Sequence, residues 1–172
     1  KLGSGLGSVT STPAGITCGV DCSEQYTDGT QLTLTAAPAD SGHQFVGWTG
    51  GCTGVTPCVI TVNSNKNVSA EFSRIVRTLT VTKIGNGTGT ISSTPAGLSC
   101  GINCTKEFPV GSQVSLSTSS TDPFVKFIGW SGACSGIGPC VVTLNADTQV
   151  SAEFNRVVRT LNVSKTGNGA DA

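Results

Sequence analysis

The chain has 172 residues and carries ten basic and ten acidic side chains, so its formal net charge is zero. Charged residues make up only 12% of the sequence and the basic ones are scattered, whereas a nucleic-acid or anionic-membrane binder needs a basic stripe. No apolar run approaches the roughly 18 residues of a membrane-spanning helix, and no charged-then-apolar leader opens the chain. We therefore expect a mature or excised segment with no nucleic-acid partner and no membrane insertion.

The sequence repeats itself with a period of 82 residues. Residues 1–82 and 83–164 align without a gap, and 38 of these 82 positions are identical. Such a period indicates a tandem array of one module. It argues against a single large core with one active site, because a site built on one module should recur on the other.

Each repeat is expected to consist of short β-strands. Apolar and polar residues alternate in the stretches 31–35, 58–62, 68–72 and 77–83, as in strands with one buried face. Turn-forming Gly, Pro and Asn residues separate these stretches, and no stretch has a convincing helical period. The sequence therefore predicts an all-β fold of two tandem, small antiparallel β modules, each a sandwich or a partly closed barrel.

The order of these strands sets the predicted domain limits. Residues 1–76 are a first β-repeat module that lacks its opening strand, residues 77–158 are a complete second module, and residues 159–172 begin a third. The junction 72–80 contains neither Gly nor Pro. This composition predicts a stiff connection and a rod-like array of repeats.

The segment 159–165 has the pattern of an opening strand, with Arg159, Leu161, Val163 and Lys165 at alternate positions. Two interpretations stay open. Either the chain is a window of a longer array, in which these residues connect neighbouring repeats, or the segment completes the first module of another copy by strand addition. The second interpretation gives a head-to-tail homopolymer, in which the partner of the chain is the chain itself.

Eight cysteines occur as one set of four repeated at the same period: Cys18, Cys22, Cys52, Cys58, Cys100, Cys104, Cys134 and Cys140. An even, repeat-matched set predicts disulfides made in an oxidising compartment, and hence an extracellular or cell-surface protein. Four cysteines per module permit three pairings, of which the two local pairs are favoured because each brackets a Gly- or Pro-containing reversal. A four-thiolate zinc site is disfavoured because the spacings depart from the usual Cys-x2-Cys.

Trp48 and Trp130 occupy equivalent positions in a Gly-Trp motif. The favoured interpretation makes them core residues that share a strand face with Val46 or Ile128, because a module with few aromatic residues needs large core side chains. The alternative makes them a ligand platform, since exposed Trp beside Gly-rich loops can stack on sugar rings. A glycan is then the second candidate partner, beside the chain itself.

No catalytic constellation is predicted. Gly97-Leu-Ser-Cys-Gly101 matches the nucleophile-elbow string, but Ser99 is replaced by Thr17 in the other repeat and no helix is expected after it. The only histidine, His43, lies upstream of Ser99 and is interpreted as a solvated side chain. We expect no enzymatic activity, no cofactor and no metal.

Several motifs occur in both repeats in the same order: Pro-Ala-Gly followed by Cys-x3-Cys, then Gly-Trp, Cys-x5-Cys and a closing Val-Ser-Ala-Glu-Phe. This string resembles the divergent internalin-B-type B-repeats of large bacterial secreted and surface proteins. The resemblance implies a bacterial cell-surface or extracellular location, a stalk, spacer or adhesive role and a relation to the β-grasp fold. The hypothesis is a structural repeat that forms a rigid stalk or a filament body, with an adhesin or glycan-binding module using loops near Trp48 and Trp130 as the alternative.

Overall fold

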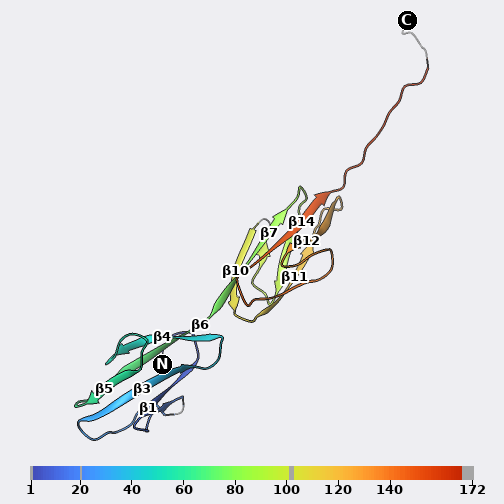
Figure 1. The fold of residues 1–172 in the computed structure, drawn as a ribbon. Coiled ribbons are helices and arrows are strands. Elements are labelled where there is room, and N and C mark those ends of the chain that lie inside the picture. Colours follow the sequence, from blue (N-terminus) through green and yellow to red (C-terminus); the bar gives the residue numbers. More distant parts are fainter. Residues whose placement is uncertain (1, 20, 101–102, 168–172) are drawn as a thin grey trace. The chain divides into compact units, whose positions relative to one another are not determined.

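The computed structural model describes residues 2–19, 21–100 and 103–167. Within these ranges the chain forms strands and no helix (Figure 1). The strands of the first repeat are β1 (Gly7–Thr12), β2 (Thr17–Cys18), β3 (Thr30–Pro38), β4 (His43–Gly50), β5 (Cys58–Val62) and β6 (Val68–Arg74). Those of the second are β7 (Val76–Ile84), β8 (Thr90–Thr94), β9 (Ser99–Cys100), β10 (Asn103–Pro109), β11 (Gln113–Ser119), β12 (Val125–Gly132), β13 (Cys140–Thr143) and β14 (Thr148–Arg156).

Each repeat contributes two sheets. The orders are β2-β1-β3-β5 and β4-β6 in the first repeat, and β10-β7-β14-β12 and β13-β11-β8-β9 in the second. None of the sheets formed by the described residues closes into a barrel. The predicted all-β class is confirmed, and the four predicted strands lie within or coincide with β3, β5, β6 and β7.

Proximity of Cα atoms groups the chain into two compact units. One contains Lys1–Leu79, Glu107–Gln113 and Thr143–Thr148, and the other contains Thr80–Lys106, Val114–Val142 and Gln149–Ala172. The hydrogen-bonded sheets follow the sequence repeats instead, so each repeat is described here by itself. The module limits at residues 76 and 158 stay a prediction.

The two sheets of the first repeat enclose one hydrophobic core. Leu34 and Cys58 reach it from the four-stranded sheet, and Trp48 and Phe72 reach it from β4 and β6. The ring of Phe45 lies between the two aromatic residues, with its centroid 5.1 Å from that of Trp48 and 5.4 Å from that of Phe72. The first repeat is therefore a small two-layer sandwich.

The second repeat buries the equivalent positions. The residues that lie 82 positions after the members of the first core are all buried: Ile91, Cys100, Leu116, Trp130, Cys140, Ala152 and Phe154. The repeated sequence pattern thus produces the same core twice, because the same strand faces are apolar in both repeats.

A β-bulge in β4 turns Trp48 toward the core. The register between β4 and β6 shifts between Phe45 and Gly47. Because side chains alternate along a strand, the additional residue places Phe45 and Trp48, three positions apart, on the same face. Val46 is exposed, so the expectation that Trp48 shares its strand face with Val46 is wrong. The second repeat has the same bulge, which leaves Ile128 exposed.

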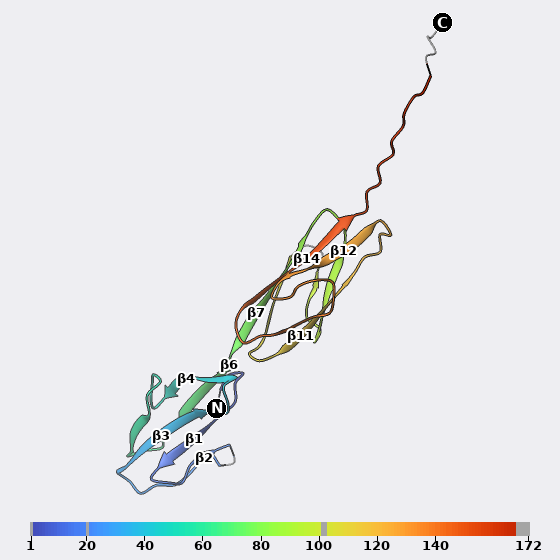
Figure 2. The same ribbon diagram turned by 45° about the vertical axis from the view of Figure 1, so that its right-hand side comes forward.

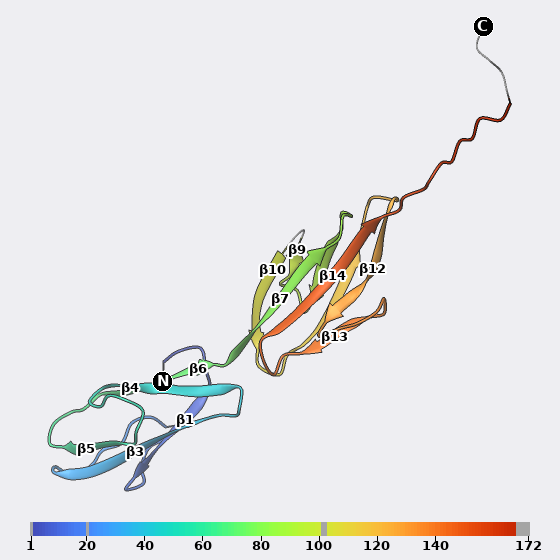
Figure 3. The ribbon, with the colours of Figure 1, turned by 45° about the horizontal axis from the view of Figure 1, so that its top comes forward.

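The opening strand of the second repeat, β7, lies inside its sheet between β10 and β14. β7 and β14 run in the same direction (Figure 3). Near their starts, Arg77 Nε donates to the Asn145 carbonyl oxygen at 3.2 Å. Just after β7 ends, the Gly87 N–H donates to the Phe154 carbonyl oxygen at 2.8 Å. The first and last strands of this repeat therefore form a parallel pair, whereas β8 with β11, β12 with β14 and β8 with β9 pair antiparallel.

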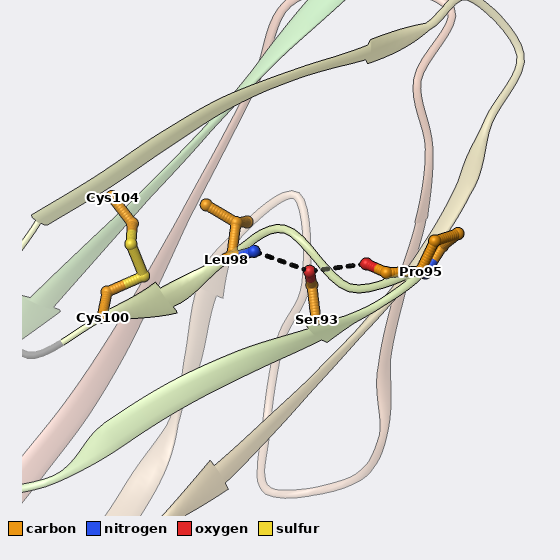
Figure 4. Close-up of a disulfide and its surroundings, with 5 residues drawn as sticks. All are labelled: Ser93, Pro95, Leu98, Cys100 and Cys104. Carbon is orange, nitrogen blue, oxygen red and sulfur yellow. Dashed lines mark hydrogen bonds between the residues drawn. A yellow bond between two sulfur atoms is a disulfide. The ribbon is translucent and has the colours of Figure 1, made fainter.

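The cysteines are paired locally, as Cys18–Cys22, Cys52–Cys58, Cys100–Cys104 and Cys134–Cys140. Cys100 belongs to β9 and Cys104 to β10 (Figure 4), and these strands lie in different sheets. This disulfide therefore ties the two layers of the second repeat together. Loops this short are stabilised by about 2 kcal/mol per bridge on the chain-entropy model.

A buried serine shapes the turn that leads to this bridge. Ser93 Oγ donates to the Pro95 carbonyl oxygen at 2.7 Å and accepts from the Leu98 N–H at 3.1 Å (Figure 4). Ser11 makes the equivalent two bonds in the first repeat. A buried hydroxyl is destabilising unless it is hydrogen-bonded. The two bonds of each serine therefore favour the turn conformation in which both bonds are made.

Candidate functional site

The segment 159–165 forms no strand in the structure. It follows the end of β14 and lies beside no other strand (Figures 1 and 2). Within the described ranges, no hydrogen bond joins it to the rest of the chain. Leu161 and Val163 are 86% and 84% exposed. Two exposed aliphatic side chains at alternate positions are typical of a strand that lacks the layer it would cover.

The same sequence pattern is buried in the second repeat. Residues 77–83 and 159–165 share five of seven residues, in the pattern Arg-Thr-Leu-x-Val-x-Lys. Leu79 and Val81 take the positions of Leu161 and Val163, and both are 0% exposed. The pattern is thus compatible with the centre of a sheet, where its two aliphatic side chains leave water completely.

The first repeat contains an open groove of about 820 Å³. Its apolar lining includes Ile16, Leu32, Trp48, Ile60, Val62 and Val68. Polar and charged residues line it as well, among them Glu24, Asp28, Asn65 and Lys66. The groove is therefore an open hollow with a mixed lining of apolar and hydrogen-bonding groups.

The groove lies where the first repeat has no counterpart of β7. Five of its apolar residues are only partly buried, whereas the residue 82 positions later is buried in each case. The pairs are Ile16 and Leu98, Tyr26 and Phe108, Ile60 and Val142, Val62 and Leu144, and Val68 and Val150. In the second repeat β7 supplies Leu79 and Val81 to the core, so we attribute the difference to that strand.

Two segments flank the groove. One is β6, whose counterpart β14 pairs with β7. The other is 22–27, whose counterpart β10 pairs with β7 on its opposite edge. Residues 22–27 belong to no strand in the first repeat, and the bridge from Cys22 to Cys18 ties them to β2. These segments are the counterparts of the two neighbours of β7, and Leu2 corresponds to Ile84, the last residue of β7.

The predicted ligand platform lies inside the core. Trp48 and Trp130 are 4% and 6% exposed, so neither indole offers a free face to a sugar. Trp48 Nε1 donates to the Thr56 carbonyl oxygen at 2.8 Å, and the Trp48 N–H donates to the Gly54 carbonyl oxygen at 2.8 Å. The tryptophan therefore anchors the loop that the Cys52–Cys58 disulfide closes.

His43 is largely buried, contrary to the expectation of a solvated side chain. Its side chain is 11% exposed and its Nδ1 lies 2.8 Å from Asp40 Oδ1. The Gly42 N–H, and after it His43, lower the pKa of the Asp40 carboxyl group. His43 is the first residue of β4 and faces Arg74 in the ladder with β6. His43 does not line the groove.

The described residues contain no group of three or more His, Cys, Asp and Glu side chains arranged to hold a metal ion. They also contain no helix of the length and apolarity required to cross a membrane. Sequence reasoning singled out the segment 159–165 but not the groove. The signal for the groove was that Ile16, Tyr26 and Val62 are apolar or aromatic residues at positions that are buried in the other repeat. This signal becomes informative only when the structure shows that β7 lies beside the equivalent positions.

Residues 7–76 match the family model described as a divergent InlB B-repeat domain. The match confirms the resemblance that the cysteine and Gly-Trp motifs indicated. No curated protein matches the chain.

Two solved structures are similar at low identity. The major pilin protein (T-13) of Streptococcus pyogenes has 13% identity and a TM-score of 0.37, over 74% of this chain and 66% of the pilin. A Mobiluncus mulieris adhesin that contains intramolecular disulfide, isopeptide and ester bond cross-links has 16% identity and a TM-score of 0.33, over 77% of this chain and 61% of the adhesin. The chain thus spans less than two thirds of each protein's length, and such low scores establish neither a common fold nor a common function.

Proposed function

We propose that the chain is a non-enzymatic structural segment of an extracellular or cell-surface bacterial protein, which acts as a rigid stalk or as the repeating body of a filament. The match of residues 7–76 to a divergent B-repeat supports this role. The paired cysteines fit an oxidising environment outside the cytoplasm. Small sandwiches closed by short disulfides suit a load-bearing spacer, because each bridge limits local opening.

In the filament, copies join head to tail when the segment 159–165 of one copy completes the first repeat of the next. The observation that carries this proposal is the contrast between the buried Leu79 and Val81 and the exposed Leu161 and Val163. Burial of each such side chain is worth about 1.5–3 kcal/mol. That gain is available only if the segment finds a sheet to enter.

Self-association of the chain tests the filament. Light scattering after size-exclusion chromatography is expected to show concentration-dependent oligomers of the full chain. The double variant Leu161→Glu and Val163→Glu, and a chain that ends at residue 158, are both expected to stay monomeric, because neither can bury the aliphatic pair. The variant Thr160→Glu and Asn162→Glu places the same charges on the other face of the segment and serves as the control. Polymers of the chain that ends at residue 158 would disprove head-to-tail strand addition.

A second candidate function is an adhesin or glycan-binding repeat that uses the loops near Trp48 and Trp130. It is favoured by Val55 and Ile137, which are exposed at equivalent positions in the two disulfide-closed loops. Ligands held there would change the emission of the tryptophan that anchors the loop. Titration with soluble glycans, followed by tryptophan fluorescence, distinguishes the two functions, since a blue-shifted emission that no glycan alters excludes this binding mode.

A further inference from the structure

We propose that Asn86 is a site of self-modification, at which the side-chain amide is lost after attack by the Gly87 backbone nitrogen, and that contacts with β14 control when this reaction occurs. The two residues lie in the turn between β7 and β8. Asparagine is a thermally labile residue, and a following glycine has no side chain that obstructs the attack. This inference is independent of the stalk and the filament proposed above.

The reaction has two steps and needs no reagent besides water. The Gly87 nitrogen forms a bond to Cγ of Asn86, and the Cγ–Nδ2 bond breaks. The side-chain amide takes up the proton that the Gly87 nitrogen loses and leaves as ammonia, so that a five-membered succinimide remains. Water then opens this ring at one of its two carbonyl carbons. The products are an aspartate at position 86 or an isoaspartate, in which the main chain runs through the former side chain.

The last residues of β14 hold both reacting groups. The Gly87 N–H donates to the Phe154 carbonyl oxygen at 2.8 Å, so the attacking nitrogen is engaged with a neighbouring strand. Asn86 Oδ1 accepts from the Arg156 N–H at 2.8 Å, which holds the attacked amide against the same strand. The nitrogen must lose its proton and turn toward Cγ, so the turn has to separate from β14 before the reaction can begin.

A third bond completes this contact. The Asn86 N–H donates to Asn155 Oδ1 at 3.2 Å, and Asn155 Nδ2 donates to Glu153 Oε1 at 2.7 Å. The second bond fixes the orientation of the Asn155 amide, so that its oxygen faces the turn. We call these contacts between residues 86–87 and 153–156 the asparagine clasp. Each of the two asparagines thus bonds the backbone beside the other.

Packing requires glycine at position 87. Gly87 is buried, and a Cβ atom there would lie 2.7 Å from Val125 Cγ1 and 2.9 Å from the Phe154 carbonyl carbon. Gly5, its equivalent in the first repeat, is equally crowded, because a Cβ atom there would lie 2.6 Å from the backbone of Ser73. The close approach of the turn to the last strand therefore explains the glycine in both repeats.

The turn does not require an asparagine. The first repeat has Ser4 at this position, and Ser4 Oγ accepts from the Arg74 N–H at 3.5 Å. Serine has no amide to lose, so the equivalent turn of the first repeat cannot undergo the reaction. Within residues 2–19, 21–100 and 103–167, Asn86 is the only asparagine that glycine follows.

The two products have different effects on the clasp. An aspartate at position 86 keeps an oxygen that accepts from the Arg156 N–H. An isoaspartate adds one carbon to the main chain before Gly87, so the N–H groups of positions 86 and 87 can no longer both reach their acceptors on β14. A molecule that carries the isoaspartate therefore stays open at this turn, and a transient separation becomes permanent.

Peptide mapping by mass spectrometry measures the reaction in the full chain. Trypsin releases Asn86 in the fragment Ile84–Lys106, and fragment ions assign the modified residue. A synthetic peptide of residues 83–90, which has no clasp, is the reference. Asn86 in the folded chain is expected to react at least about a hundredfold more slowly than in the peptide, because only open molecules react. Equal rates would overturn control by the fold.

A matched pair of variants tests the clasp itself. Asn155→Ser introduces the residue that the first repeat has at this position, Ser73, and removes the acceptor of the Asn86 N–H. The reaction at Asn86 should become about fivefold faster, because one hydrogen bond that opposes opening is lost. Ser92→Ala removes an exposed hydroxyl elsewhere in the repeat and should leave the rate unchanged. Equal rates in the two variants would show that the clasp does not control the reaction.

Two further measurements distinguish local from global opening. Separation of one turn exposes little surface, so the rate should be nearly constant in urea below the unfolding transition. A steep rise with urea would mean that only globally unfolded chains react, and would exclude the clasp as the gate. The isoaspartate form, isolated by ion exchange, should unfold at lower urea than the variant Asn86→Asp. Equal midpoints would disprove the permanent opening.

Discussion

Leu2 is held on the edge of β6 by Phe72, whose N–H donates to the Leu2 carbonyl oxygen at 2.9 Å. The Leu2 N–H donates in turn to the Ala70 carbonyl oxygen at 2.8 Å. These bonds cover one end of the β6 edge only. From Ala70 back to Val68, β6 faces the groove. In the second repeat, β7 covers the equivalent edge of β14.

The first prediction concerns a chain extended by Arg-Thr-Leu-Thr-Val-Thr before Lys1, which copies residues 77–82. The added strand is expected to fill the groove from the same molecule and to raise the free energy of unfolding of the first repeat by about 2–4 kcal/mol, because it buries one Leu and one Val. Denaturant unfolding monitored by amide exchange in β6 measures the change. The extension with Glu in place of Leu and Val is the control, and an equal gain from both extensions would contradict the prediction.

The second prediction compares two leucines in the same sequence pattern. Leu79→Ala removes a side chain that is fully buried in β7 and should lower the free energy of unfolding by about 2–5 kcal/mol. Leu161→Ala alters an exposed side chain, so the stability of the monomer should change by less than about 0.5 kcal/mol. Urea unfolding at low protein concentration compares the two variants. Similar losses in both would mean that the segment 159–165 is packed within the monomer.

The third prediction concerns the buried hydroxyl in the turn before β9. Ser93→Ala removes the group that bonds both Pro95 and Leu98 and should destabilise the second repeat by about 1–3 kcal/mol, since the Leu98 N–H loses this partner. The neighbouring Ser92, whose exposed hydroxyl meets Ser117 at 2.9 Å, is the matched control. Thermal unfolding of Ser92→Ala should change little, and a greater loss there than in Ser93→Ala would disprove this role.

Local patterns in the sequence were sufficient to predict four of the strands, which are β3, β5, β6 and β7. The alternation in 77–83 predicted a strand with Leu79 and Val81 on one face, and both side chains are buried in β7. The spacing of the cysteines favoured local pairs, which are the pairs in the structure. In each case the relevant interactions join residues that are near in sequence, so a short window contains the information.

Long-range features were not visible in the same way. The bulge between Phe45 and Gly47 depends on the register against β6, and a period-two pattern cannot reveal one additional residue. The parallel pairing of β7 with β14 joins segments about one whole repeat apart, and nothing local to either strand specifies its neighbour. The groove is more remote still, because its lining comes from segments between residues 9 and 70 that lie far apart in the sequence.

The parallel pairing of β7 and β14 has a mechanical consequence. A pulling force applied to the two ends of the second repeat acts at the start of β7 and at the end of β14, and so pulls these neighbouring strands along their length in opposite senses. The hydrogen bonds between them are then loaded together in shear, whereas pulling an antiparallel hairpin apart at its open end breaks its bonds one after another. A repeat built this way resists extension until the two strands slide past each other as a whole, which is the behaviour required of a tether under tension.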